Sequence, residues 1–277
     1  MPVGHCPSAS PWRQPVESRS FSGFYECQNK HIRTLEIWLS DTKRTKELRP
    51  MFEKQPEAMQ QRVKSLATES LRQSDPSGWF ETLYTEANGD SEQVPWASLT
   101  PHPYLQDWLE HYKPQGDGCS VLVIGCGLGD DAEALAQRGF RVTAFDISPT
   151  AIAWCQKRFP DSLVTYVVAD LFAMPPAWHH AFDFVVESRN IQALPLGVRP
   201  KVIESIVQLV AKGGRLLVIT RVRDLDVEPD GPPWPLSNKE LAQFQELRLQ
   251  EIHRDSFDDT DNDSVKKLRI EYLRAYT

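Results

Sequence analysis

The 277-residue sequence has no run of about 18 apolar residues, the minimum length for a membrane-spanning helix. Its first twenty residues lack an apolar core with a small-residue cleavage site behind it, so they do not resemble a secretory signal. The sequence contains no internal repeats, and charged and apolar residues occur in ordinary proportions. These absences lead us to expect a globular, cytoplasmic protein with no membrane partner, long enough for one sizeable α/β domain and an appendage.

Cysteine is scarce and irregularly spaced. The five cysteines, at positions 6, 27, 119, 126 and 155, are odd in number and follow no disulfide framework. Cys6, Cys27 and His31 are conceivable metal ligands, but without a C-x-x-C pair we expect no metal site. A reduced, cytoplasmic setting fits this cysteine usage best.

The net charge of −7 argues against a nucleic-acid partner. Basic residues are concentrated between positions 29 and 73, and acidic residues between 224 and 263. Both regions can be solvated surface, or the acidic region and the basic N-terminal helix can contact each other.

The order of apolar and polar segments predicts the domain organisation. Residues 1–22 are rich in Pro and Ser and are expected to form a flexible tail. Residues 23–75 are expected to form an N-terminal helical extension, ended by the turn sequence SDPSG. Residues 76–277 then form the main domain.

Strand-like and helical segments alternate in the main domain, which predicts a parallel sheet with crossover helices on both faces. The expected strands are Ser120–Gly125, Arg141–Asp146, Leu163–Ala169, Phe182–Glu187 and Arg215–Thr220. The expected helices are Tyr104–Tyr112, Asp131–Arg138, Pro149–Arg158, Arg199–Ala211 and Asn238–Leu247, the last opened by a Ser237/Glu240 capping box. Two final runs, Leu249–Phe257 and Lys266–Tyr276, predict an antiparallel hairpin. The predicted fold class is therefore α/β, with a Rossmann-like seven-stranded sheet whose parallel core ends in a C-terminal hairpin with one antiparallel strand.

A cluster of glycines follows the first expected strand. Gly125, Gly127 and Gly129 open a helix there, so backbone N–H groups and the helix dipole face the end of the sheet. The dinucleotide fingerprint needs a glycine at position 130, which is Asp130, followed by Asp131. Two carboxylates at a helix start repel a pyrophosphate and suit a ligand with a positive centre. S-adenosylmethionine, which has an amino group and a sulfonium but no phosphate, fits this pattern.

Acidic residues close the following strands and extend the predicted cofactor site. Asp146 can accept hydrogen bonds from both ribose hydroxyls, and Asp170 can accept one from the adenine amino group with Leu171 beside the ring. Glu187 or the acids of the first helix would receive the amino-acid end. Cys126 and Ile147, which lie within these turns, complete the cofactor-binding set.

The motifs VLVIGCGLGDDAEALAQRG, VTAFDISPTAIAWC, VVADLF, FDFVVE and LVAKGGRLLVIT together resemble the class I S-adenosylmethionine-dependent methyltransferases, from about Trp79 to Thr277. The glycine-cluster region looks like the thiopurine methyltransferase-like branch that acts on small molecules. The segment from Trp79 to the expected helix before the first strand is similar to the lead-in that covers the cofactor in that branch. This resemblance implies that Trp96, with Trp79 and Tyr84, packs near the methionine end or forms a lid. The first 75 residues do not match the branch.

Candidate acceptor-binding residues follow the fourth and fifth strands. Arg189 and Arg221 can bind an anionic acceptor such as a carboxylate, or can pair with nearby acids. Asn190 lies beside Arg189, and Trp234 in a Pro-rich loop can wall the pocket. Methyl transfer from a sulfonium has a neutral leaving group, so positioning supplies most of the rate and a soft nucleophile needs no strong base. No residue stands out as a general base, and the catalytic residues are not assigned.

The sequence leaves several functions open. The first is methyl transfer to a small-molecule S, O or N nucleophile; the second is methylation of a peptide or protein docked by the N-terminal extension. A third is a non-catalytic scaffold of the same fold, against which the intact glycines and aspartates argue. A nicotinamide-dependent oxidoreductase is disfavoured by Asp130. The oligomeric state is not predicted.

Overall fold

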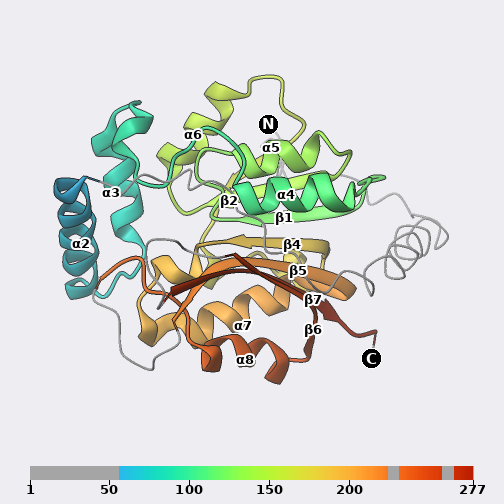
Figure 1. The fold of residues 1–277 in the computed structure, drawn as a ribbon. Coiled ribbons are helices and arrows are strands. Elements are labelled where there is room, and N and C mark those ends of the chain that lie inside the picture. Colours follow the sequence, from blue (N-terminus) through green and yellow to red (C-terminus); the bar gives the residue numbers. More distant parts are fainter. Residues whose placement is uncertain (1–55, 224–230, 258–264, 277) are drawn as a thin grey trace, which may run out of the picture. The chain divides into compact units, whose positions relative to one another are not determined.

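The computed structural model describes residues 56–223, 231–257 and 265–276, which belong to one compact unit spanning residues 41–277. Seven strands form a single sheet in the order β3-β2-β1-β4-β5-β7-β6 (Figure 1). Their bounds are β1 Ser120–Ile124, β2 Arg141–Asp146, β3 Thr165–Val168, β4 Phe182–Ser188, β5 Val210–Arg223, β6 Leu249–Phe257 and β7 Val265–Arg274. The first five strands are parallel, and β7 runs antiparallel to both β5 and β6. The predicted Rossmann-like sheet with one reversed strand is confirmed.

Helices flank both sides of this sheet. Their bounds are α2 Glu57–Arg72, α3 Gly78–Ala87, α4 Pro103–Tyr112, α5 Asp130–Ala136, α6 Pro149–Arg158, α7 Arg199–Leu209 and α8 Asn238–Glu246. Helices α4, α5 and α6 lie on one side of the sheet, and α7 and α8 on the other (Figure 1). Because both faces are covered, the central strand β1 is apolar after Ser120, and every residue of it is buried.

Local capping explains where the helices begin. Ser148 caps α6 by accepting the N–H of Ala151 at 2.9 Å, and a proline follows at the first helical position. The predicted capping box of α8 is present: Ser237 Oγ accepts the N–H of Glu240, and Glu240 Oε2 accepts the N–H of Ser237 at 2.7 Å.

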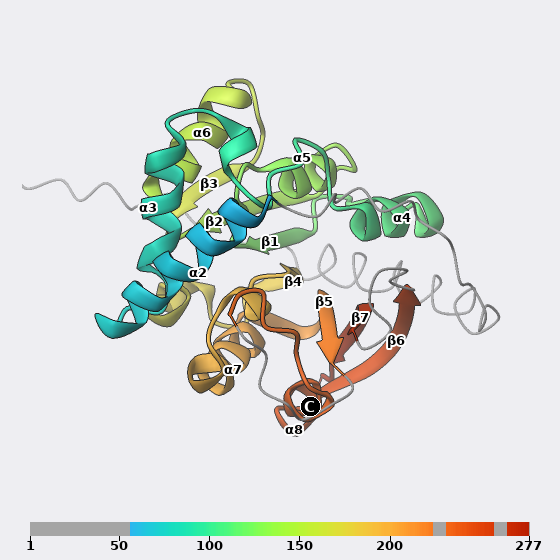
Figure 2. The same ribbon diagram turned by 60° about the vertical axis from the view of Figure 1, so that its left-hand side comes forward.

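Helix α2 is the described part of the N-terminal helical extension. It packs against α3 (Figure 2), and the two helices share a hydrophobic cluster that includes Val63, Ala67 and Leu83. Since the expected tail at residues 1–22 lies outside the described residues, the predicted domain division stays a prediction.

The cysteines differ in part from expectation. Cys126 and Cys155 are free thiols, but Cys119 is disulfide-bonded, which the sequence spacing did not predict. Cys6, Cys27 and His31 lie outside the described residues. In the described part of the chain, no helix has the length and apolar character needed to cross a bilayer.

Candidate active site

The glycine cluster forms a tight turn between β1 and α5. Gly125 and Gly129 have φ angles of +52° and +91°, in the left-handed region that favours glycine. An added Cβ at Gly125 would lie 2.0 Å from Asn190 Oδ1, and one at Gly129 would lie 2.5 Å from Tyr166 Oη. Both backbone conformation and space therefore require glycine at these positions.

Asp146 links this turn to the turn after β2. Its Oδ2 accepts the N–H of Gly127 at 2.9 Å, and its Oδ1 accepts the N–H of Ser148 at 3.0 Å. The residue is only 6% exposed, and burial raises its pKa to about 6. Each carboxylate oxygen has a second lone pair, so the group retains capacity for two hydroxyl donors.

Aromatic residues from α3 and the segment after it pack on the glycine turn. Trp96 donates its Nε1–H to Tyr84 Oη at 2.7 Å. A Cβ on Gly127 would lie 3.2 Å from that hydroxyl and 3.9 Å from the Trp96 ring. Trp79 stands behind them, 3% exposed and edge-on to Trp96 at 5.8 Å. The structure thus brings Tyr84 and Trp96 to the turn, whereas Trp79 supports them from the core.

Two acids at the start of α5 have partners that their spacing does not reveal. Asp130 forms a two-pronged ion pair with Arg158, at 2.9 and 2.8 Å. Asp131 Oδ1 accepts the N–H of His102 at 2.6 Å, and burial raises the pKa of Asp131 to about 6. Arg158 offsets the charge of Asp130, so the repulsion of a pyrophosphate that two carboxylates at this helix start predict is weakened at Asp130.

Asp170 follows β3 and caps the short helix Leu171–Ala173, accepting the N–H of Phe172 at 2.8 Å. The N–H of Ala169 donates to the backbone carbonyl of Asp146 at 3.0 Å. The segment that carries Asp170 and Leu171 therefore lies beside the end of β2, where Asp146 and Ile147 follow each other. Their adenine-binding role stays a prediction.

Glu187 closes β4 beside the glycine turn, opposite Ile124 in the sheet register. It has no exposed surface, and its Oε1 accepts the N–H groups of Asn190 at 2.5 Å and Ile191 at 3.0 Å. Its Oε2 has no hydrogen-bond partner among the described residues, and burial raises its pKa to about 7. Asn190 donates to Ile124 O at 2.8 Å and so joins the β4 end to the glycine turn.

Three cations gather at the ends of β4 and β5. Arg221 lies directly opposite Lys267 in the β5–β7 ladder, and the N–H of Arg189 donates to Ile219 O at 2.9 Å. Like charges opposite each other in a ladder are destabilising. The pKa of Arg189 is lowered to about 10, chiefly by burial and then by the charge of Arg221.

His102, the N-cap of α4, faces this cationic cluster of Arg189, Arg221 and Lys267. Burial first, and then those three charges, lower its pKa to about 3. Its Nδ1 accepts the N–H of Tyr104 at 3.2 Å. The ring is therefore neutral, and its proton lies on Nε2.

Comparison with known proteins agrees with this geometry. Residues 86–274 match the profile of the family thiopurine S-methyltransferase. The chain belongs to the thiopurine S-methyltransferase family. It is a methyltransferase whose cofactor is S-adenosylmethionine, as the resemblance of its motifs implied.

Relatives of this thiopurine S-methyltransferase family member carry different names. A probable thiol methyltransferase 2 of Arabidopsis thaliana is 29% identical over 175 residues, 61% of this chain and 72% of that protein. The cypemycin N-terminal methyltransferase of a Streptomyces species is 33% identical over 117 residues, 42% of this chain and 44% of that protein. The N-methyltransferase NodS of Bradyrhizobium japonicum, solved with S-adenosylhomocysteine, has a TM-score of 0.53 at 21% identity, covering 70% of this chain and 97% of that one. That structural likeness supports the fold.

Trp234, the predicted wall of the acceptor pocket, packs against α2 and α3. It is 8% exposed and belongs to their hydrophobic cluster. Its N–H donates to Gln192 O at 2.7 Å, and its carbonyl accepts from Arg199 Nη2 at 2.5 Å. The predicted pocket wall is thus also a packed anchor of the β5–α8 connection.

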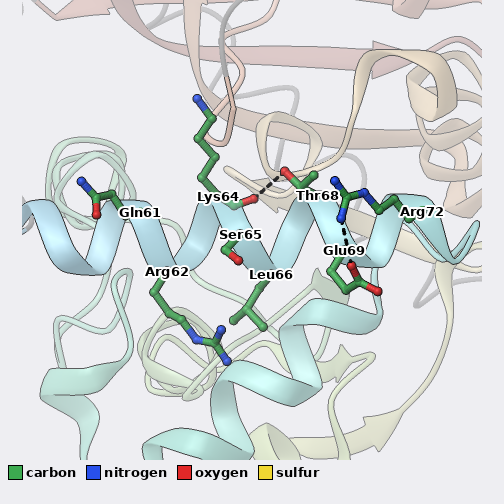
Figure 3. A pocket seen from close by; sticks show the side chains of 8 residues that line it. All are labelled: Gln61, Arg62, Lys64, Ser65, Leu66, Thr68, Glu69 and Arg72. Carbon is green, nitrogen blue, oxygen red and sulfur yellow. Dashed lines mark hydrogen bonds and ion pairs between the residues drawn. The ribbon is translucent and has the colours of Figure 1, made fainter.

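A separate pocket lies on α2 (Figure 3). Its described lining residues fall between Gln61 and Arg72 on that one helix. None of these residues belongs to the predicted cofactor site.

Sequence reasoning missed Lys267 and left His102 without a role. The alternation of β7, in which Leu268, Ile270 and Tyr272 are buried, puts Lys267 on the opposite face. That pattern was readable, but the register that sets Lys267 opposite Arg221 was not.

Proposed function

We propose that this protein transfers the methyl group of S-adenosylmethionine to a small acceptor that carries a carboxylate, with a thiol as the methylated group. The cofactor lies over the glycine turn, with its ribose on Asp146 and its adenine near Asp170. The unpartnered Oε2 of Glu187 beside the turn receives the amino group, because an ammonium would offset the cost of burying that carboxylate.

The cationic cluster is the observation that carries the choice of acceptor. Arg221 and Lys267 lie opposite each other, and Arg189 follows β4 one strand away. A carboxylate bound among them would accept charge-assisted hydrogen bonds from these side chains. The neutral His102 would donate from Nε2 to the same anion.

The chemistry favours sulfur over oxygen or nitrogen. His102 is a poor base because its Nδ1 is already an acceptor for Tyr104 and the nearby cations disfavour a second ring proton. Asp131 is engaged by the N–H of His102, and Glu187 is assigned to the amino group of the cofactor. A thiol needs little help, because neighbouring cations stabilise its thiolate and the displacement expels a neutral thioether. The relative named as a thiol methyltransferase supports this choice.

The test compares mercaptobenzoic acid with its uncharged carboxamide at pH 7.5. We expect kcat/KM to be higher for the acid by roughly 10-fold to 100-fold, the range for a hydrogen-bonded charge. Arg221→Gln should remove most of that difference and leave the carboxamide rate unchanged. Equal kcat/KM for the two acceptors, in the presence of measurable turnover, would refute an anion-binding pocket.

Peptide N-terminal methylation is the second candidate, supported by the cypemycin N-terminal methyltransferase relative. The cationic cluster disfavours it, since a peptide amine is itself cationic at neutral pH. A short unblocked peptide included in the same assay separates the two, because turnover of the peptide without turnover of either thiol favours this candidate.

A further inference from the structure

Glu81, in the first turn of α3, is not one of the predicted cofactor-binding residues, but its carboxylate accepts several hydrogen bonds. Its Oε2 accepts the hydroxyl of Ser148 at 2.5 Å and the N–H of Thr150 at 3.2 Å. Its Oε1 accepts the hydroxyl of Thr150 at 2.7 Å and that of Thr85 at 3.2 Å. The carboxylate therefore lies at the N-terminus of α6, where a negative charge is favoured.

Ser148 connects Glu81 to the ribose turn. Its hydroxyl donates to Glu81 and accepts the N–H of Ala151, so both roles of the hydroxyl are occupied and its rotamer is fixed. Its own N–H donates to Asp146 Oδ1 at 3.0 Å, and Asp146 Oδ2 holds Gly127. A continuous chain of hydrogen bonds thus runs from α3 through the turn after β2 to the glycine turn.

The same helix carries Tyr84, one turn after Glu81, and the hydroxyl of Tyr84 lies beside Gly127. Tyr84 also meets Trp154 of α6 edge-on at 6.1 Å. Helix α3 therefore reaches the glycine turn with an aromatic residue and the ribose turn with a carboxylate.

We propose that Glu81 is a positioning residue for the cofactor: it holds α3 on the turn after β2 and so keeps Ser148 and Asp146 in the geometry that receives the ribose. This inference rests on the ribose position proposed above and is independent of which acceptor is methylated. Its loss should weaken cofactor binding while leaving the chemical step intact, because no contact of Glu81 reaches the cationic cluster in the described part of the chain.

The test uses Glu81→Gln, with Glu86→Gln as the matched control. Glu86 lies on the same helix but pairs with Arg62 on an exposed face. We expect the Kd values for S-adenosylmethionine and S-adenosylhomocysteine, measured by calorimetry, to rise roughly tenfold in Glu81→Gln, the scale of one hydrogen bond to a charged group. The kcat at saturating cofactor should stay within about twofold, and Glu86→Gln should match the wild type.

The pH dependence of binding supplies a readout that a merely structural role would not move. Burial is the main cause that raises the pKa of Asp146, backbone N–H groups of Ser148, Gly127 and Ile147 lower it, and the charge of Glu81 raises it further. Tyr84 and Cys126 also face Asp146, but their pKa values lie well above the ordinary range, so both are neutral near pH 6. Glu81→Gln should therefore shift the acid limb of cofactor binding to lower pH.

A double-mutant cycle completes the test. Ser148→Ala alone should weaken binding, and the combination with Glu81→Gln should weaken it by less than the product of the two effects, because both variants break one chain. Unchanged Kd in Glu81→Gln, or full multiplicativity in the cycle, overturns the inference. If Glu81→Gln does not fold, Thr150→Val, which removes one donor to Glu81 and leaves Ser148 in place, should raise the Kd for S-adenosylmethionine, and an unchanged Kd overturns the inference. Loss of binding in Asp146→Asn with none in Glu81→Gln would leave the ribose position standing and reject only the role of Glu81.

Discussion

Replacing Asp146 by asparagine should separate the charge of this side chain from its shape. The carboxylate already accepts one N–H on each oxygen, from Gly127 and Ser148. The ribose would add two hydroxyl donors to the remaining lone pairs. Asparagine keeps one acceptor oxygen and turns an NH₂ group toward donors. With hydrogen bonds to charged groups worth about 1.5–3 kcal/mol, we expect a loss of about 2–4 kcal/mol of cofactor binding, or roughly 30-fold to 1000-fold in Kd.

The same substitution makes a prediction about pH. Burial raises the pKa of Asp146 to about 6, and only the ionised carboxylate can accept both hydroxyls. Wild-type affinity should therefore fall as pH drops through 6, in addition to any fall caused by protonation of Glu187 near pH 7. Asp146→Asn should lose the part of this fall that belongs to Asp146 and show a shallower pH dependence.

Calorimetric titration with S-adenosylmethionine from pH 5 to pH 8, beside thermal unfolding, measures both effects. Asp183→Asn is the control: Asp183 accepts the N–H of Ser120 at 2.9 Å, far from the glycine turn. A Kd within threefold of the wild type in folded Asp146→Asn, or a wild-type affinity that is flat across this range, would refute the assignment of Asp146 to the ribose.

Two further predictions concern stability. Gly129→Ala should lower the free energy of unfolding by about 1–3 kcal/mol, because φ is +91° and the new Cβ would lie 2.5 Å from Tyr166 Oη. Chemical denaturation measures this loss. The control is Gly197→Ala, where a Cβ meets nothing within 4 Å, and an equal effect of the two substitutions would contradict the prediction. Burial raises the pKa values of Glu187 and Glu271 from 4.5 to about 7. Their folded pKa values exceed the unfolded ones, so the stability they contribute is complete below about pH 4.5 and is lost as pH rises through 7. The free energy of unfolding should fall by a few kcal/mol from pH 5 to pH 8 in denaturant titrations, and a rise over this window would contradict the assignment.

The fold was largely predictable because its signals are local. An apolar run, a glycine turn and a capped helix recur along the chain, and the expected bounds of β2 and α6 match the structure. The fifth strand was predicted over Arg215–Thr220 but extends over Val210–Arg223. Of this extra length, residues 221–223 pair with β7 and Val210 pairs with Phe182 of β4. Such pairing depends on register, which a single strand's pattern does not carry.

The candidate site was predictable only in part because its pairings are long-range. The glycines and Asp146 stand at strand ends, where sequence order alone indicates a ligand edge. The ion pair of Asp130 with Arg158 joins two helices, and the contact of Glu81 with Ser148 joins residues 67 positions apart. Neither leaves a pattern in neighbouring residues, so only the packed structure reveals them.

Asp146 and the pair Arg221 and Lys267 differ in how many contacts a substitution would break. Asp146 hydrogen-bonds two turns, through Gly127 and Ser148, so its substitution disturbs both turns at once and needs compensating changes elsewhere. Arg221 and Lys267 instead occupy ladder positions that are set by main-chain pairing between β5 and β7. In the acceptor site proposed above, single substitutions at those two positions would redirect acceptor choice and leave the sheet whole. On that proposal, acceptor specificity can change by single substitutions in the β5–β7 ladder, whereas a change of methyl donor needs several substitutions together.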